Sequence, residues 1–393
     1  MLGILGRKTL LFQGDVSSAL NETKAKVAGA SFLIIGGAGS IGQQVARQIF
    51  ALGPRRLHVI DLSENNLVEL VRDLRSSIGY ISGDFKTLAL DVGSTECEAF
   101  LREQAPYDYV LNLSAMKHVR SEKDPYSLMR MIRVNILNTE STLAYAIQAK
   151  SRKYFAVSSD KAVNPANAMG ATKRVMELCL LRASRDIQVS TARFANVAFS
   201  DGSLLHGFHQ RLAKRQPISA PRDVLRYFMT GQEAGHLCVL SSLLGNNREL
   251  FFPKPSKELA LTDFPGIAVR FLESKGYAPH PCATEEEARG RAEELISQRK
   301  WPCYFFTSDT EGEKSAEEMF SQAEDLDMNR FLDIGVSRHQ ELKDSSSVEE
   351  FLKAVRRFLD AGTWDKGDLA EILLRAVPEF RHKAAGRTLD DRM

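Results

Sequence analysis

The sequence has few cysteines, and none of them lie close together along the chain. Five are spread over 393 residues without a CxxC pair, so neither a disulfide framework nor a cysteine-based zinc site is indicated. We expect a reducing cytoplasm as the compartment. The cysteines are Cys97, Cys179, Cys238, Cys282 and Cys303.

The sequence also lacks an excess of charge of one sign and long apolar runs. Its 52 basic and 50 acidic residues leave a net charge of +2, which predicts no general attraction to nucleic acid or to an anionic membrane. No run reaches the roughly 18 apolar residues of a membrane helix, and the N-terminus lacks the apolar core and cleavage site of a signal peptide. We expect a soluble, unsecreted protein without membrane insertion that holds small anionic ligands at local sites.

Short apolar segments rich in β-branched residues alternate with helical periodicity through the first half of the chain. This pattern predicts a parallel sheet with helices on both faces, because strands buried on two sides read as nearly continuous apolar runs. The expected fold is therefore α/β, a Rossmann-type doubly wound parallel sheet. The predicted strands are residues 31–37, 56–62, 86–92, 109–115, 153–159 and 189–197.

The pattern changes after residue 197 to shorter elements, which we interpret as a smaller substrate-binding lobe interleaved with the sheet. From about residue 281 the chain becomes polar and carries charged and amphipathic helical segments. We therefore expect a largely helical C-terminal extension that lies on the surface or contacts a partner. The expected boundaries are 1–29 for an N-terminal lead segment, 30–197 for the Rossmann domain, 198–280 for the lobe and 281–393 for the extension.

A glycine-rich segment, GGAGSIG, follows the first predicted strand and opens a helix. Its GxxGxxG spacing lets the backbone turn tightly and approach a pyrophosphate, whose charge is attracted by the N–H groups at the start of the helix. A strand before the motif and a helix after it favour a dinucleotide site over an ordinary tight turn. The predicted cofactor contacts here are Gly36, Gly39, Ser40, Ile41 and Gly42.

Two acidic residues follow the next strands at positions that suit a dinucleotide. Asp61 ends the second strand, where a carboxylate can accept both hydroxyls of the adenosine ribose. Since the same carboxylate would repel a 2′-phosphate, NAD is favoured over NADP. Asp91 ends the third strand and is placed to hydrogen-bond an adenine amino group; the alternative is that Asp91 or Ser94 caps the following helix.

A third set of residues surrounds the end of the fifth predicted strand. Ser159 ends that strand, and Met169 and Lys173 lie on the helix that follows. Positions i and i+4 share one helical face, so we expect Met169 and Lys173 both to face the cofactor. The fifth strand and its helix are therefore the predicted centre of the site.

Three separated motifs, SSDKAVNPANAMGATKR, NLSAMKHV and RYFMT, make residues 31–245 resemble the polysaccharide-biosynthesis nucleotide-sugar dehydratases, chiefly the UDP-N-acetylglucosamine 4,6-dehydratases. These are extended short-chain dehydrogenase/reductases, and most carry a tyrosine where this chain has Met169. One branch, usually preceded by membrane helices, also carries methionine, and this chain lacks those helices. The resemblance implies NAD as cofactor, a UDP-sugar as substrate and a homo-oligomer, because such enzymes commonly pair through a helix bundle.

The resemblance also implies a reaction, in which the C4 hydride of the sugar passes to NAD, the C6 hydroxyl leaves with the C5 proton, and the hydride returns to C6. It assigns Asp160 as the acid and Lys161 as the base of the elimination, roles that need a dry site. A thioether transfers no proton, so Met169 only packs. The C4 proton then goes to Lys173, directly or through water and Ser159, or to Lys161.

By the same resemblance, a further group of side chains lines the sugar-nucleotide pocket, and Thr139 supports it from the same helix as Asn135. Three positions depart from the family pattern: Phe199 and Asp201 replace a glycine and a basic or amide residue, and Arg120 replaces a proline. These departures leave the identity of the sugar and the nucleotide open. The expected substrate contacts are Lys117, Asn135, Arg193, Asn196 and Arg226.

Two alternative functions remain open. A nucleotide-sugar 4-epimerase or oxidoreductase would need the tyrosine more and the Asp160–Lys161 pair less. A non-catalytic NAD-binding regulatory or scaffold protein would not need that pair at all. Because the Asp160–Lys161 pair is present, the sequence favours the 4,6-dehydratase.

A metal site is not predicted. His206, His209 and His236 have no carboxylate or cysteine cluster at ligand spacing.

Overall fold

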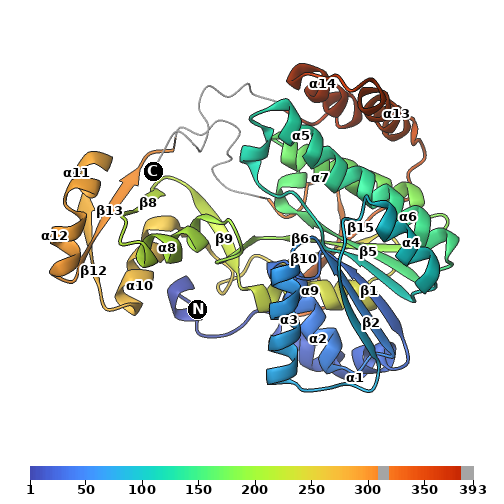
Figure 1. The fold of residues 1–393 in the computed structure, drawn as a ribbon, viewed down its shortest axis with the longest axis horizontal. Helices are drawn as coiled ribbons and strands as arrows, with labels where there is room; N and C mark the ends of the chain where they lie inside the picture. Colours follow the sequence, from blue (N-terminus) through green and yellow to red (C-terminus); the bar gives the residue numbers. More distant parts are fainter. Residues whose placement is uncertain (309–317, 382–393) are drawn as a thin grey trace.

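The computed structural model describes residues 1–308 and 318–381, which fold around one large sheet (Figure 1). This sheet has nine strands in the order β14-β15-β10-β6-β5-β4-β1-β2-β3. Neighbouring strands from β10 to β3 run parallel, whereas β15 is antiparallel to β10 and β14 is antiparallel to β15. The strands are β1 (Ser31–Ile35), β2 (Arg56–Asp61), β3 (Asp84–Ala89), β4 (Tyr109–Asn112), β5 (Lys153–Ser159), β6 (Gln188–Phe194), β10 (Glu249–Pro253), β14 (Asp325–Asp327) and β15 (Ile334–Arg338).

The central strands are buried along most of their length. Every residue of β1 is buried, and in β5 only Ser159, the last residue, is partly exposed. Such continuous burial requires helices on both faces of the sheet, because side chains alternate between the two faces along a strand. The predicted α/β class and doubly wound parallel sheet are confirmed.

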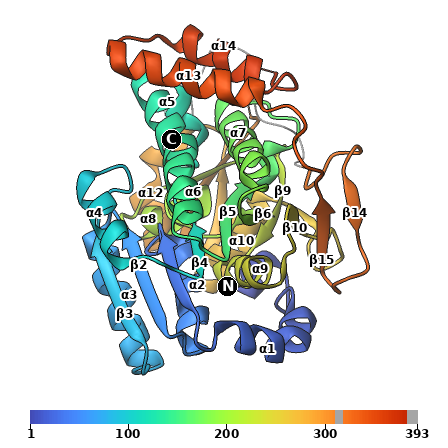
Figure 2. The ribbon, with the colours of Figure 1, turned by 90° about the vertical axis from the view of Figure 1, so that its right-hand side faces the viewer.

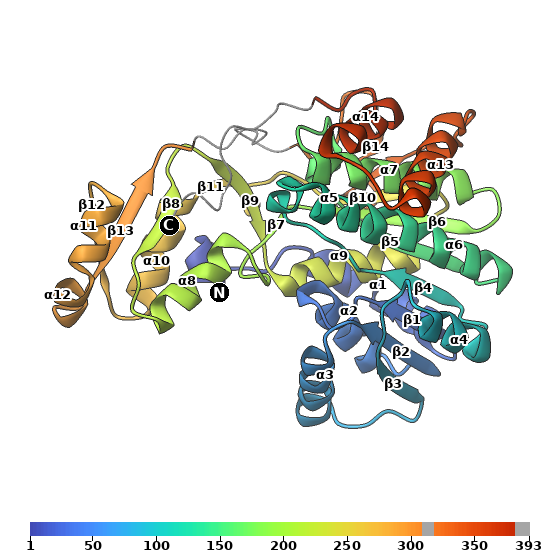
Figure 3. The ribbon, with the colours of Figure 1, turned by 45° about the horizontal axis from the view of Figure 1, so that its top comes forward.

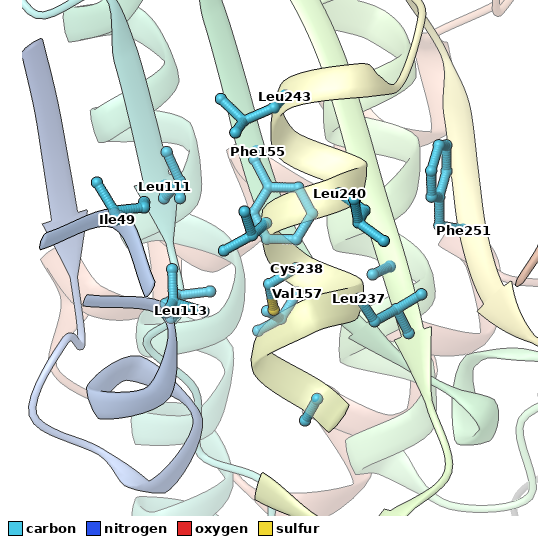
Figure 4. Close-up of a cluster of buried hydrophobic side chains, with 14 of the residues drawn as sticks. Ile49, Leu111, Leu113, Phe155, Val157, Leu237, Cys238, Leu240, Leu243 and Phe251 are labelled. Carbon is cyan, nitrogen blue, oxygen red and sulfur yellow. The ribbon is translucent and has the colours of Figure 1, made fainter. Parts of the chain in front are cut away.

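Four helices cover one face of this sheet. Figure 4 shows how α9 packs Leu237, Leu240 and Leu243 against the sheet around Phe155. Because α9 is apolar on all sides, it is buried between the sheet and the helices α1 and α2. These helices are α1 (Gln13–Val27), α2 (Ser40–Ala51), α3 (Glu64–Ser77) and α9 (Gly231–Leu244).

A second helical layer covers the opposite face. Apolar residues of α4, α6 and α7 form one core cluster with β1, β4 and β5. A short π-helix, η3 (Arg133–Leu137), joins α5 to α6, and such bulges in a helix often lie at functional sites. The helices are α4 (Thr95–Gln104), α5 (Pro125–Ile132), α6 (Asn138–Gln148) and α7 (Ala168–Ala183).

A helical hairpin of α13 (Ser346–Ala361) and α14 (Lys366–Ala376) lies across α5 and α7 (Figure 2). The hairpin and the two helices share a single buried apolar cluster. The outer faces of α5 and α7 are therefore covered from within the same chain. The cluster includes Leu128, Ile132, Ala171 and Val175 below, and Phe351, Leu352, Leu369 and Leu373 in the hairpin.

A smaller lobe lies to one side of the large sheet (Figure 3). It contains a parallel sheet in the order β12-β13-β8, and a second small sheet, β11-β9-β7, leads to it from the Rossmann domain. The strands are β7 (Asn196–Val197), β8 (Ile218–Pro221), β9 (Leu225–Met229), β11 (Leu261–Asp263), β12 (Ala278–Cys282) and β13 (Lys300–Phe306). The helices are α8 (Leu204–Ala213), α10 (Phe264–Ser274), α11 (Glu285–Gly290) and α12 (Ala292–Ser297).

The N-terminal lead segment connects the lobe to the Rossmann domain. Its first turn, η1 (Leu2–Leu5), packs against α10. Arg7 then forms a buried ion pair at 2.8 Å with Glu233 near the start of α9, and the same carboxylate accepts the Leu11 N–H. Removing one charge of such a pair leaves the other unpaired inside the protein. The lead segment is thus part of the fold.

The domain organisation differs from the expected boundaries. Helix α9 and β10, from the 198–280 segment that was expected to interleave with the Rossmann domain, complete that domain. Strand β13 and helices α11 and α12, expected in the C-terminal extension, build the lobe, and β14 and β15 extend the large sheet. Within residues 318–381, the helices of the extension are α13 and α14. A strand that pairs with a distant partner gives little sign of that partner in its own sequence.

Candidate active site

The glycine-rich turn lies between β1 and α2, as predicted. Gly36 has a left-handed φ of 72°, and Gly39 is the N-cap of α2. A Cβ on Gly42 would lie 2.2 Å from the carbonyl oxygen of Gly36, so only glycine fits there. Because the turn carries no side chains at its glycines, a pyrophosphate can come close to the backbone N–H groups at the start of α2, where Ser40 and Ile41 lie.

Asp61 ends β2 beside this turn. One carboxylate oxygen accepts the Ala38 N–H at 2.9 Å, and the other accepts the Ser63 N–H at 3.0 Å. These bonds fix the carboxylate next to the glycine-rich turn, where a ribose acceptor is needed. The residues present fit a dinucleotide with an unphosphorylated ribose.

Asp91 lies two residues beyond the end of β3. Its carboxylate accepts the Gly93 N–H at 3.2 Å and pairs with Arg130 at 3.3 Å. Ser94, not Asp91, caps α4 by accepting the Cys97 N–H at 3.2 Å. The capping role considered for this segment therefore belongs to Ser94.

The end of β5 holds a compact polar cluster. The Ser159 hydroxyl donates to Oδ1 of Asp160 at 2.8 Å, and Nζ of Lys161 lies 3.1 Å from the same oxygen. Asp160 is 1% exposed. Among residues 1–308 and 318–381, its other oxygen, Oδ2, is buried without a hydrogen-bond partner. A buried carboxylate oxygen without a partner is costly unless a ligand or a proton satisfies it.

Helix α7 follows this cluster and carries Met169 and Lys173, both 3% exposed. Asn167 caps the helix by accepting the Gly170 N–H at 2.9 Å. Nζ of Lys173 donates to the carbonyl oxygen of Val157 in β5 at 3.0 Å. Burial lowers the pKa of Lys173 to about 8. Its ammonium is therefore far easier to deprotonate than that of a surface lysine.

Asn135 lies in the π-helix and holds the SAMKHV segment in place. Its amide oxygen accepts the Met116 N–H at 2.9 Å, and its amide nitrogen donates to the Met116 carbonyl at 3.0 Å. The same nitrogen also donates to the Thr172 hydroxyl of α7 at 3.0 Å. Thr139, one turn later, donates to the carbonyl of Asn135 and accepts from Asn112. The expected substrate contact at Asn135 is replaced by a supporting role, because its amide is buried and engaged by the protein.

Lys117 follows the segment that Asn135 holds. Its Nζ donates to the Ser200 hydroxyl at 3.3 Å. The surrounding protein atoms displace water and lower its pKa, although the carboxylate of Asp201 opposes this shift. The Asp201 N–H donates to Ser40 at the start of α2 at 2.9 Å. Lys117 thus lies beside the loop that reaches the glycine-rich turn.

The structure contradicts the substrate role expected of Arg193. Its guanidinium is 1% exposed and pairs with Glu177 of α7 at 2.8 Å and with Glu324 at 2.7 Å. Although burial alone would raise it, the charge of Arg193 holds the pKa of Glu177 at about 2. The Ser158 hydroxyl donates to Glu177 at 2.6 Å. Arg193 therefore stabilises the junction of β5, β6 and α7 from inside the core.

The last two expected contacts lie on the strands that join the lobe to the Rossmann domain. Asn196 in β7 donates to the carbonyl of Tyr227 at 3.5 Å. Arg226 in β9 is 4% exposed, and its Nη1 donates to the carbonyl of Leu225 at 2.8 Å. Both residues are thus brought to the same small sheet, β11-β9-β7.

Glu122 holds the start of α7, a role that could not be seen in the sequence. Its carboxylate accepts the Ala168 N–H at 2.5 Å, at the first residue of α7. Burial raises the pKa of Glu122. A carboxylate at a helix start is favourable, but a glutamate 46 residues before that helix carries no signal of the contact.

The fold and the site define this chain as an α/β protein with a Rossmann-type doubly wound sheet, with the glycine-rich turn and the β5–α7 junction at the carboxyl ends of the parallel strands. The chain belongs to the polysaccharide biosynthesis protein family, whose model matches residues 32–338. The resemblance stated from its motifs is therefore confirmed.

Curated relatives in this family are similar over parts of their length. The chain is 29% identical over 287 residues to the probable polysaccharide biosynthesis protein EpsC of Bacillus subtilis, covering 72% of this chain and 46% of that protein. It is 28% identical over 243 residues to a UDP-N-acetylglucosamine 4,6-dehydratase (inverting) of Campylobacter jejuni, covering 59% of this chain and 69% of the relative. The match thus spans less than half of EpsC.

Solved structures share the fold. Pen from Bacillus thuringiensis superposes with a TM-score of 0.65 at 21% identity, covering 86% of this chain and 98% of Pen. The dTDP-glucose 4,6-dehydratase DesIV of Streptomyces venezuelae, solved with NAD, gives a TM-score of 0.56 at 15% identity, covering 74% of this chain and 88% of DesIV. In the described part of this chain, no helix is both long and apolar enough to cross a membrane.

Proposed function

We propose that this chain is an NAD-dependent nucleotide-sugar 4,6-dehydratase. It would convert UDP-N-acetylglucosamine, or a related NDP-N-acetylhexosamine, to a 4-keto-6-deoxy sugar nucleotide for surface polysaccharide. The observation that carries the proposal is the ion pair between the buried Asp160 and the partly exposed Lys161 at the end of β5, with one carboxylate oxygen unpartnered among the described residues. A soluble homo-oligomer in the cytoplasm fits this role.

The glycine-rich turn and Asp61 are proposed to hold NAD. The turn cradles the pyrophosphate against the start of α2, and Asp61 accepts from the adenosine ribose, with Asp91 next to the adenine. NAD would supply the hydride chemistry, taking the C4 hydride and returning it at C6. The chain's own residues then have to move protons and hold the sugar.

Asp160 is proposed as the acid that protonates the departing C6 hydroxyl. Ser159 and Lys161 both engage Oδ1, so Oδ2 is the oxygen left to meet the substrate. Lys161 is the base that removes the C5 proton, since its side chain is 20% exposed, against 2% for Asp160, and is therefore the easier of the two for a bound sugar to reach. An acid and a base on adjacent residues can serve neighbouring carbons of one sugar.

Lys173 is proposed as the base for the C4 hydroxyl, in place of the absent tyrosine. Its lowered pKa leaves a useful fraction of neutral amine near neutral pH. The described hydrogen bonds link Ser159 to Asp160 and Lys161, so Ser159 organises the elimination pair. Met169 packs beside Lys173 without moving a proton.

The sugar nucleotide is proposed to lie between the β5–α7 junction and the small sheet that leads to the lobe. Lys117 offers a cation to the diphosphate. Arg226 and Asn196 offer donors from β9 and β7. Neither Asn135 nor Arg193 is included, since both are committed to the core.

Incubation with UDP-N-acetylglucosamine in deuterated water, followed by proton NMR, tests the proposal. A new C6 methyl signal with deuterium at C5 is the expected result. A changed C4 configuration without a methyl signal would mean a 4-epimerase, an activity named for UDP-glucose 4-epimerases that are similar to part of this chain. Unchanged sugar with tightly held NAD would mean a scaffold, and either outcome contradicts the dehydratase.

A further inference from the structure

The lobe carries a cluster of potential metal ligands that lies away from the β5–α7 site. The cluster joins the end of β12, an edge strand of the lobe sheet, to the start of α11. His280 and Cys282 are two residues apart on β12, so their side chains emerge on the same face of the sheet. Glu287 lies in the first turn of α11, which Thr284 caps.

The donor atoms of these side chains converge. The imidazole nitrogen of His280, the thiol sulfur of Cys282 and a carboxylate oxygen of Glu287 all lie within 4.8 Å of one another. In a tetrahedral zinc site such donors are about 3.5 Å apart. Small side-chain rotations of His280 and Glu287, which are both partly exposed, would close that gap.

The guanidinium of Arg291 already contacts two of these three side chains. Nη1 of Arg291 lies 3.5 Å from Nε2 of His280 and 3.3 Å from Oε1 of Glu287. The lone pairs of both ligands are therefore aimed at one positive group. Arg291 is not confined there, because its side chain is 40% exposed and also pairs with Glu294 at 3.5 Å. It can move aside without losing every partner.

We propose that His280, Cys282 and Glu287 form a binding site for a divalent metal of the zinc type, for which the guanidinium of Arg291 competes. A thiolate and a carboxylate balance the two positive charges of the ion, and imidazole, thiolate and carboxylate are ligands that zinc accepts. Binding breaks the S–H bond of Cys282, forms a metal–sulfur bond and releases the thiol proton to solvent. Water would fill the fourth position.

The site would stabilise the lobe, since the metal would tie the edge strand β12 to α11. A ligand that binds only the folded state raises the free energy of unfolding according to its concentration. The role is independent of the dehydratase chemistry, because the three ligands lie in the lobe and touch none of the residues assigned to proton transfer.

Titration of the metal-free full chain with Co²⁺ tests this proposal, because a cobalt–thiolate bond gives an intense charge-transfer absorption that zinc does not show. We expect the band to saturate at one ion per chain in the natural protein. Cys282→Ser should abolish it. Cys303→Ser is the matched control, since Cys303 is buried on the adjacent strand β13 and is not a proposed ligand. Circular dichroism would check that each variant is folded.

The competing guanidinium gives a second, opposite prediction. Arg291→Ala should bind Co²⁺ roughly tenfold more tightly than the natural chain, a change in the range seen when groups next to metal ligands are altered. Zinc should also raise the melting temperature of the lobe in Arg291→Ala. A charge-transfer band that persists in Cys282→Ser, or no band in either the natural chain or Arg291→Ala, would overturn the proposal.

Discussion

The guanidinium of Arg193 in β6 lies 2.8 Å from the carboxylate of Glu177 in α7, and both side chains are almost completely buried. A second carboxylate, Glu324, meets the same guanidinium at 2.7 Å. The pair links the strand next to the candidate catalytic strand with the helix that carries Met169 and Lys173. An arginine that matches a family's substrate-contact motif is therefore a core residue in this chain.

Arg193→Met should destabilise the protein by about 3–5 kcal/mol, because it leaves the charge of Glu177 buried without its main partner. Urea unfolding at constant protein concentration measures the change. The double variant Arg193→Met with Glu177→Gln should recover part of the loss, since the charge of Glu177 is then removed and only Glu324 has lost its partner. If Arg193 held the substrate instead, the variant would keep its stability and raise KM.

Gly42→Ala should weaken NAD binding by about 10- to 100-fold, as expected for a methyl group forced into a closely packed turn. The added Cβ would lie 2.2 Å from the Gly36 carbonyl oxygen. Gly207→Ala in α8 is the control, because its Cβ would meet no atom within 4 Å and the residue lies outside the glycine-rich turn. Fluorescence titration with NADH measures the affinity of each variant. An equal loss of affinity in the two variants would contradict the close contact between residue 42 and the Gly36 carbonyl.

The activity of the natural enzyme should rise with pH through about 8, because Lys173 has to be neutral to accept the C4 proton. Lys173→Met should lower turnover by about 10²- to 10⁴-fold.

The same pKa shift of Lys173 predicts a pH dependence of stability. Burial makes the pKa of Lys173 lower in the folded chain than its unfolded value of 10.5, so between these two pKa values the unfolded chain binds the extra proton. The free energy of unfolding should therefore gain a contribution from Lys173 as pH rises from about 8 to 10.5. Lys173→Met should lose that contribution, which urea unfolding across this range would detect.

Leu373→Ala should cost about 2–5 kcal/mol, because the side chain is fully buried between the hairpin and helices α5 and α7. Leu374→Ala, at the next position and 46% exposed, should change stability by less than about 0.5 kcal/mol. Thermal unfolding of both variants measures the difference. Similar effects at the two positions would contradict the packing of α14 on the catalytic layer.

The Rossmann domain could be predicted from the sequence because its strands are continuous apolar runs and its glycine turn needs a fixed spacing. The place of Asp160 and Lys161 at the end of a strand also followed from that strand pattern, whereas their roles came from the resemblance to the family. The ion pair of Arg193 could not be predicted, because Glu324 is 131 residues away in the chain. The buried ion pairs with Glu177 and Glu324 make Arg193 a core residue, and the residues next to it in the sequence give no sign of these partners.

In the lobe, too, contacts between separate elements could not be predicted from the sequence. His280, Cys282 and Glu287 have no spacing that is typical of a zinc motif. They meet because an edge strand ends beside the start of a short helix. The segment that forms α13 was predictable as an amphipathic helix, whereas its pairing with α14 and the position of the hairpin over α5 and α7 followed only from the structure.

The central claim is that Asp160 and Lys161 carry the proton transfers of the elimination. Proton NMR of the NAD-loaded Asp160→Asn and Lys161→Met variants, with UDP-N-acetylglucosamine in deuterated water, tests it most directly. The amide of Asp160→Asn keeps the shape of the side chain but cannot give up a proton as a carboxylic acid does. Both variants should retain NAD and form the C6 methyl group at least about 100-fold more slowly than the natural enzyme. Methyl formation at the natural rate in either variant would contradict the account.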